Sequence, residues 1–161
     1  MDLESRARAD DPQAIRLWLR MMACAATVER EERRRLRAEF DTTPPRFGLM
    51  AQLHRSPVGL SMGELSQRLM VTGGNVTGIA EQLVKEGMVA READPHDRRA
   101  YRLSLTLKGR RQFSRMAAAH EKWTIELFSA LSDEETAQTY ALLGKLKAGL
   151  ARQETKGGDK G

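Results

Sequence analysis

The chain has 161 residues, of which 40% are hydrophobic and 30% charged, a size and composition typical of one soluble globular domain with or without helical extensions. No apolar run approaches the about 20 residues that span a bilayer, and the opening Met-Asp-Leu-Glu lacks the basic start of a signal peptide, so we expect a cytoplasmic protein with no membrane partner. The single cysteine excludes an internal disulfide and a cysteine-rich zinc site, and the net charge of +5 favours a polyanionic partner only modestly.

A long helix is predicted over residues 12–40, and Pro12 fits its first position, where a missing N–H does no harm. Residues 29–37 alternate acids with arginines, which is typical of a solvated face with internal ion pairs; a supporting contact with a DNA backbone is the alternative. Two prolines break the chain, and a short helix is predicted from about Pro45 to His54. The apolar residues of the long helix that recur at helical spacing are Ile15, Trp18, Met22 and Ala25.

Two further helices with only three residues between them have the pattern of a helix-turn-helix. Ser61 and Glu64 have the spacing of a capping box, which starts the first helix. Thr72 can cap the second helix, and Gly87 suits its end, where a left-handed residue is needed. The apolar residues of the second helix, which predict its buried face, are Val76, Ile79, Ala80 and Leu83; its other face holds small or polar residues, Asn75, Thr77, Gly78, Gln82 and Lys85.

Two strands are predicted after Gly87. Leucines at 103, 105 and 107 alternate with polar residues, and residues 88–93 are the expected partner strand. The loop between the strands, residues 94–100, contains the adjacent Arg98 and Arg99. A hairpin with a basic tip directly after such a helix predicts a DNA-binding winged helix-turn-helix; two core helices with a surface hairpin are the alternative.

The C-terminal part is predicted to be helical again. Thr106 can cap a helix that extends to about residue 131, and Ser132 with Glu135 forms a second capping box. The N- and C-terminal helices hold more apolar residues than a lone winged domain can bury, so we expect a homodimer whose two recognition helices lie roughly 34–36 Å apart on one duplex. The inner side of the last helix is predicted to hold Ala137, Tyr140, Leu143, Leu146 and Leu150.

The expected fold is therefore mainly α with a small β-hairpin wing. It divides into an N-terminal dimerisation helix at 12–40, a winged helix-turn-helix domain at 44–107 and C-terminal dimerisation helices at 108–152. The Gly- and Lys-rich residues 153–161 are predicted to be a disordered tail.

The segment from Gly87 through Asp-Pro-His-Asp-Arg-Arg at 94–99 to Leu-Thr-Leu-Lys-Gly at 105–109 resembles the wing of the MarR family of bacterial transcription regulators. Gly-Asn-Val-Thr-Gly and Gln-Leu-Val-Lys-Glu-Gly before it resemble that family's recognition helix. The resemblance covers about residues 12 to 150 and is strongest in the middle. It implies a repressor that dimerises through both terminal segments, binds a pseudo-palindromic operator in double-stranded DNA and responds to a small-molecule effector, often an anionic aromatic.

The predicted recognition helix would enter the major groove by its N-terminal half. Many family members have an arginine directly after the threonine that matches Thr77, and this chain has Gly78 there, which cannot hold a guanine in a bidentate way. Readout would then depend more on the neighbouring polar residues and on the wing. Contacts with phosphates or base edges are predicted for Thr72, Asn75 and Thr77, phosphate binding for the N–H groups of Gly73 and Gly74, and flanking backbone contacts for Gln82 and Lys85.

For the wing, the resemblance suggests that Arg99, with or without Arg98, enters the minor groove, where narrow A·T-rich sequences attract arginine. Asp97, and with it Asp94, is expected to hold the loop by pairing with one of the two arginines. An ordinary solvent-exposed ion pair is the competing interpretation.

No residue pattern resembles a catalytic centre or a phosphate-binding loop, so we expect neither an enzyme nor a cofactor. His54, His120 and Cys24 lack the spacing of metal ligands, and we expect no metal site. Cys24 is expected to be buried and to act as a small hydrophobe rather than as a redox sensor. The candidate lining of an effector pocket, with plain core packing as the alternative, is Trp18, Met22, Phe47, Met50, His54 and Trp123.

Two other functions stay open beside the effector-controlled repressor. One is a constitutive or architectural DNA-binding protein without an effector. The other is a helical protein-interaction module that binds no DNA.

Overall fold

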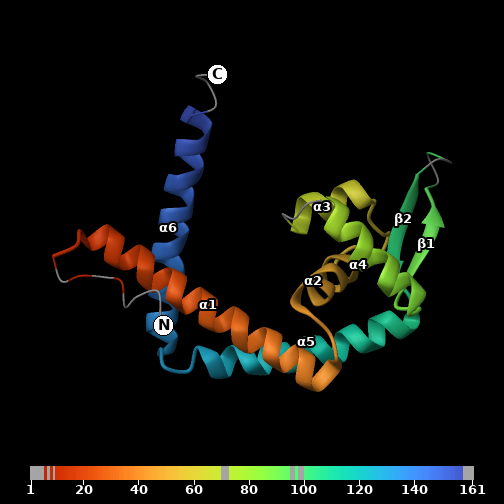
Figure 1. Cartoon of the computed structure of the whole chain (residues 1–161), viewed down its shortest axis with the longest axis horizontal. Coiled ribbons are helices and arrows are strands. Elements are labelled where there is room, and N and C mark those ends of the chain that lie inside the picture. Colours follow the sequence, from red (N-terminus) through yellow and green to blue (C-terminus); the bar gives the residue numbers. More distant parts are fainter. Residues whose placement is uncertain are drawn as a thin grey trace. The chain divides into compact units, whose positions relative to one another are not determined.

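The computed structural model describes residues 6, 8, 10–69, 73–94, 97 and 100–157. The chain forms two compact units, Met1–Glu121 and Lys122–Gly161. In these described ranges the predicted fold class is confirmed: the chain is mainly helical and has one antiparallel hairpin (Figure 1). The elements are α1 (Gln13–Phe40), α2 (Pro44–His54), α3 (Met62–Leu69), α4 (Gly73–Lys85), β1 (Val89–Ala93), β2 (Tyr101–Leu105), α5 (Leu107–Leu127) and α6 (Asp133–Gly157).

Local signals in the sequence start and end several of these helices. At α3, the Ser61 N–H donates to Glu64 Oε2 at 2.8 Å and the Glu64 N–H donates to Ser61 Oγ at 3.2 Å, which is the predicted capping box. Ser132 and Glu135 make the same two hydrogen bonds at α6, also at 2.8 and 3.2 Å. Gly87 follows α4 with a φ of 72°, the left-handed conformation that the end of this helix requires.

One hydrophobic core joins the helix-turn-helix to the hairpin. In Figure 1, α2, α3 and α4 lie together beside the two strands, which rise from the beginning of α5. Since each fully buried side chain contributes roughly 1.5–3 kcal/mol relative to an exposed one, a core shared in this way makes the recognition helix and the wing fold as one body. Its buried members are Leu49, Met50, Leu53, Leu60, Leu65, Val76, Ala80, Leu83, Val89, Leu103, Leu105, Phe113 and Met116.

The segment before α3 is joined to the hairpin by an isolated β-bridge between Leu60 and Leu103. β1 and β2 pair from Val89 opposite Leu105 to Ala93 opposite Tyr101. On the other edge of β2, the Leu60 N–H donates to the Leu103 carbonyl at 2.9 Å and the Leu103 N–H donates back at 2.8 Å. Gly59 has a φ of 80°, and a Cβ there would lie 2.8 Å from the Leu103 carbonyl oxygen. Only glycine therefore allows this close approach without strain.

Cys24 is exposed, so the expectation that it is buried was wrong. The physical reason is its position on α1, where Leu19 and Ala23 are the buried residues of this stretch. A residue one position after Ala23 is turned by about 100° around a helix, which takes it off the buried face.

The terminal helices differ from the sequence prediction at their ends. α5 ends at Leu127, before the expected residue 131, and α6 continues to Gly157, so the first residues predicted for the tail are helical. Good helix formers, Ala151 to Glu154, precede the first glycine there, which explains the extension. In the single chain the predicted inner side of α6 is exposed, Tyr140 and Leu150 included. Among the described residues, no helix is both long and apolar enough to cross a bilayer.

Candidate nucleic-acid interface

Helix α4 has a buried apolar face and an exposed polar one. Val76, Ala80 and Leu83 are buried, and Ile79 is partly so. The exposed residues are those that the sequence assigned to DNA contact, Asn75, Thr77, Gln82 and Lys85, together with Gly78. The backbone of Gly73 and Gly74 forms the beginning of the helix, while Thr72 lies outside the described residues.

Gly78 lies in the middle of the exposed face of α4. A Cβ built at this position meets no atom within 4 Å. The packing of the domain therefore does not require glycine here, and the helix surface is open to a larger side chain.

The C-terminal end of α4 is anchored to α2 by a bidentate ion pair. Arg46 Nη1 donates to Glu86 Oε1 at 2.8 Å, and Nη2 pairs with Glu86 Oε2. The hydrogen bond from Arg46 is the main reason why the pKa of Glu86 is lowered, and Lys108 adds to the effect. Arg46 Nη1 also lies 3.5 Å from Gln82 Oε1, so one predicted DNA-contacting residue is in reach of the same guanidinium.

The tip of the wing lies partly outside the described residues, and with it Arg98 and Arg99. The loop is closed by backbone hydrogen bonds from the Asp94 N–H to the Ala100 carbonyl and from the Ala100 N–H to the Asp97 carbonyl, both at 3.0 Å. The predicted pairing of Asp94 and Asp97 with one of these two arginines lies outside the described residues as well. Asp94 Oδ2 lies 3.4 Å from Nη1 of a third arginine, Arg102.

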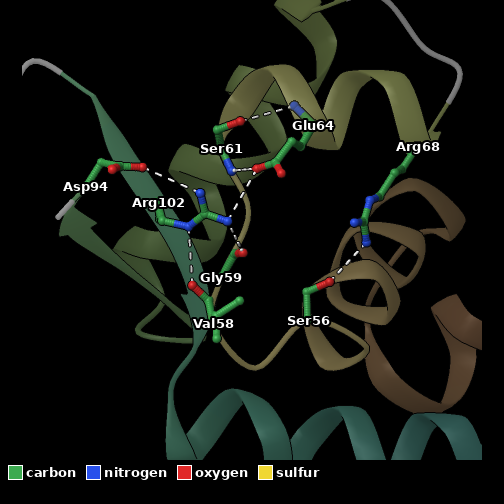
Figure 2. Close-up of polar contacts among 8 residues, drawn as sticks. All are labelled: Ser56, Val58, Gly59, Ser61, Glu64, Arg68, Asp94 and Arg102. Atoms are coloured by element: carbon green, nitrogen blue, oxygen red, sulfur yellow. Dashed lines mark hydrogen bonds and ion pairs between the residues drawn. The ribbon is translucent and has the colours of Figure 1, made fainter. Parts of the chain in front are cut away.

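Arg102 binds four groups where the wing meets the helix-turn-helix, as Figure 2 shows. Its Nη2 donates to the Gly59 carbonyl at 2.7 Å and its Nε to the Val58 carbonyl at 3.3 Å. Besides Asp94, it pairs with Glu64, whose Oε2 lies 3.5 Å from Nη2. The sequence pattern places Arg102 only on the polar face of a strand, because its partners are up to 44 residues away and follow no helical or strand spacing.

Glu64 takes part in both the cap of α3 and the Arg102 cluster. The hydrogen bond from the Ser61 backbone, followed by that from the Ser61 hydroxyl, lowers the pKa of Glu64, and the charges of Arg102 and Arg68 lower it further. At the other end of α3, Arg68 Nη1 donates to the buried Ser56 Oγ at 2.9 Å (Figure 2). Both ends of α3 are thus tied to the segment that connects α2 with α3.

The residues predicted to line an effector pocket lie in different surroundings in the described structure. Phe47 stacks on Phe113 with 5.5 Å between ring centroids and on His120 with 4.9 Å, and His54 lies 4.8 Å from Phe113. Met50 is buried in the core, Trp123 is also buried, and Trp18 and Met22 are exposed. Within the part of the chain that is described, no three His, Cys, Asp or Glu residues are grouped so as to hold a metal ion.

A cavity of about 430 Å³ lies beside the Arg46–Glu86 pair. Arg37 and Asp41 also line it, and Arg46 Nε is buried without a hydrogen-bond partner. The cavity thus combines charged groups with an apolar lining of Phe40, Met50, Leu83, Met88 and Met116.

The comparisons with known proteins agree with this geometry. A model of the MarR family matches residues 40–100. An uncharacterized HTH-type transcriptional regulator of Bacillus subtilis, YkoM, is 33% identical over 116 residues, or 71% of this chain and 73% of the relative.

Two solved structures have the same fold. The crystal structure of a MarR family transcriptional regulator from Silicibacter pomeroyi is 34% identical, has a TM-score of 0.75 and covers 89% of this chain and 99% of its own. A mutant of MarR from E. coli, solved in complex with operator DNA, is 24% identical with a TM-score of 0.74 and covers 83% of this chain and 95% of its own. The chain therefore belongs to the MarR family of DNA-binding transcriptional regulators.

Proposed function

We propose that the protein is a homodimeric repressor that binds a pseudo-palindromic operator and is released from it by a small-molecule effector. The observation that carries the DNA-binding part is the exposed polar face of α4 on a helix whose other face is buried in the core that it shares with the wing. Such a helix can enter a major groove without any loss of packing.

The proposed contacts follow from the places of the residues. Asn75 and Thr77 lie in the N-terminal half of α4 and would reach base edges or phosphates, and Lys85 the flanking backbone. The N–H groups of the first turn, at Gly73 and Gly74, would bind a phosphate, and Thr72 would support them. Further contacts are proposed for Gln82, for which Arg46 competes, and for Arg98 and Arg99 in the minor groove.

Exposed apolar residues on the terminal helices support the proposed homodimer. On α1, Ile15, Trp18 and Met22 are exposed, and on α6 the same is true of Leu143, Leu146 and Leu150. Apolar stripes of this kind are typical of surfaces that another chain covers. A two-fold dimer would present two α4 helices to successive major grooves of one duplex.

For the effector, we propose the cavity beside Arg46. A small organic anion would meet two guanidinium groups there, Arg46 paired with Glu86 and Arg37 paired with Asp41, with apolar side chains beside them. Arg46 Nε, which is buried without a hydrogen-bond partner, offers it a hydrogen bond. Such a ligand would compete with Glu86 for Arg46 and so change how the end of α4 is held. The ligand must lower the affinity of the protein for DNA by the same factor by which DNA lowers the affinity of the protein for the ligand.

The effector test compares two arginines of α1. Benzoate serves as the probe and should weaken DNA binding by the wild type. Arg37→Gln, which removes a cation from the cavity lining, should reduce this response, whereas Arg33→Gln, on an exposed part of the same helix, should not. A response that is equal in all three proteins would place the effector elsewhere.

The DNA-binding test is a fluorescence-anisotropy titration with duplex from upstream of the protein's own gene, against a scrambled duplex of the same length. We expect specific binding that weakens steeply with salt, since bound phosphates release counterions. Equal affinity for both duplexes would indicate an architectural DNA-binding protein. No binding at low salt would indicate an interaction module.

A further inference from the structure

We infer that Arg102 is a positioning residue for DNA binding: it sets the wing loop relative to the helix-turn-helix without touching DNA itself. This inference rests on the proposed DNA-binding function and adds to it a residue outside the predicted contact surface. Figure 2 shows the guanidinium between the strand that carries it and the start of α3.

The contacts of Arg102 join three parts of the domain. Asp94 is the residue at which the chain leaves β1 for the wing loop. Glu64 belongs to the first turn of α3, and Gly59 and Val58 to the segment before it. One side chain therefore connects the root of the wing loop to the helix that precedes the recognition helix.

Partial burial and the planar shape of the guanidinium strengthen these contacts. The Arg102 side chain is only 27% exposed and that of Asp94 only 15%, so solvent screens their ion pair less than a surface pair. The planar guanidinium binds two carbonyls and two carboxylates at once, which a lysine ammonium on a flexible stem cannot reproduce. Loss of the fork would leave the backbone pairing of Leu60 with Leu103 in place but remove the contacts through which Arg102 links the loop root to α3.

Two variants of Arg102 distinguish the hydrogen-bonding geometry of the guanidinium from its positive charge. Arg102→Gln removes the guanidinium, and Arg102→Lys keeps the charge but not the fork. Arg91→Gln, in the same hairpin, is the matched control: Arg91 lies 4.2 Å above the Tyr101 ring and does not join the cluster. We expect Arg102→Gln and Arg102→Lys to weaken operator binding by about five- to tenfold, and Arg91→Gln to weaken it clearly less.

A double-mutant cycle with Arg99→Ala tests whether Arg102 acts through the wing. Arg99→Ala alone should weaken binding by at least about tenfold if the wing reads the minor groove. In the Arg99→Ala background, Arg102→Gln should then cost little more, because there is no wing contact left to position. Hydroxyl-radical protection in the minor groove should be lost in Arg102→Gln, while methylation protection in the major groove persists.

Four outcomes would overturn the inference. If Arg102→Gln binds the operator like the wild type, or if its effect adds fully to that of Arg99→Ala, Arg102 does not position the wing. If Arg102→Lys restores affinity, charge alone is sufficient. An Arg99→Ala protein with unchanged affinity would exclude the wing itself. All four results would leave specific DNA binding by the wild type intact, so the proposed function would stand.

Discussion

Gly78 is a residue at which a change of one side chain should alter how DNA is read. It lies on the exposed face of α4, and the space around it is open. We predict that Gly78→Arg strengthens operator binding by about tenfold, because a bidentate arginine–guanine pair discriminates by roughly 1–3 kcal/mol. The affinity for operator and scrambled duplexes, measured by anisotropy at one salt concentration, checks this.

Gly78→Ala controls for the helix itself. Replacing glycine in an exposed helix interior should stabilise the domain by up to about 1 kcal/mol without adding a contact to DNA. The urea midpoint should therefore rise in both variants, whereas the operator affinity should rise only in Gly78→Arg. If Gly78→Arg raised affinity for scrambled DNA as much as for the operator, the added charge and not base readout would be responsible.

Glu64 makes the stability of α3 dependent on pH. Its pKa lies below the ordinary value of 4.5 in the folded chain, chiefly because it accepts hydrogen bonds from Ser61. The folded state therefore favours the carboxylate, and the stability that results is present above about pH 4.5 and is lost as pH falls through the lowered pKa.

The variant Glu64→Gln tests this assignment, because glutamine can complete the capping box but carries no charge. We predict that the free energy of unfolding of this variant falls less than that of the wild type between neutral pH and about pH 3. Urea titrations over that range give both curves. Two parallel curves would mean that other carboxylates, Glu86 among them, cause the acid sensitivity.

At the scale of elements, the end of α4 and the start of the wing are joined to the first turn of α5 by hydrogen bonds. Thr106 Oγ1 donates to the Gly87 carbonyl at 2.7 Å and accepts from the Gly109 N–H at 2.9 Å, so it caps the helix and holds the end of α4. A Cβ at Gly109 would lie 1.9 Å from the Met88 carbonyl oxygen. We predict that Gly109→Ala destabilises the domain by about 1–3 kcal/mol, as overpacking does.

Gly144→Ala is the matched control, since Gly144 is also helical and its Cβ would meet nothing within 4 Å. This change should be neutral or stabilising by up to about 1 kcal/mol. Chemical unfolding of the two variants beside the wild type measures the difference. If Gly109→Ala were as stable as the wild type, β1 and α5 would have room to separate.

Elements whose signals lie within a few residues of the sequence were predictable from it. The capping boxes at Ser61 and Ser132 depend on residues three positions apart, and both were confirmed. The Arg102 cluster and the Arg46–Glu86 pair were not predicted, because they join residues about 40 positions apart whose proximity follows only from the packed core. The burial of Cys24 was predicted wrongly because the apolar residues of α1 form a wide stripe. Periodicity alone does not show which edge of such a stripe is buried.

At the scale of the whole molecule, α6 has exposed apolar residues that would form the interface of the proposed homodimer. Leu143, Leu146 and Leu150 lie on a helix whose described side chains are almost entirely exposed. If a second copy covers this stripe, each operator half-site is bound at a high effective concentration once the other is occupied. Dimerisation and operator affinity should then be lost together.

The last prediction concerns the double variant Leu146→Glu, Leu150→Glu. Burial of two carboxylates in an apolar contact is strongly unfavourable, so we expect a monomer in sedimentation velocity. Affinity for the full operator should fall by at least about tenfold, and affinity for one half-site should stay nearly unchanged. The control is Ala148→Glu, about 200° around the helix from Leu146, which should remain dimeric. A double variant that stays dimeric would move the interface away from α6, whereas a monomer with undiminished operator affinity would show that each copy binds DNA independently.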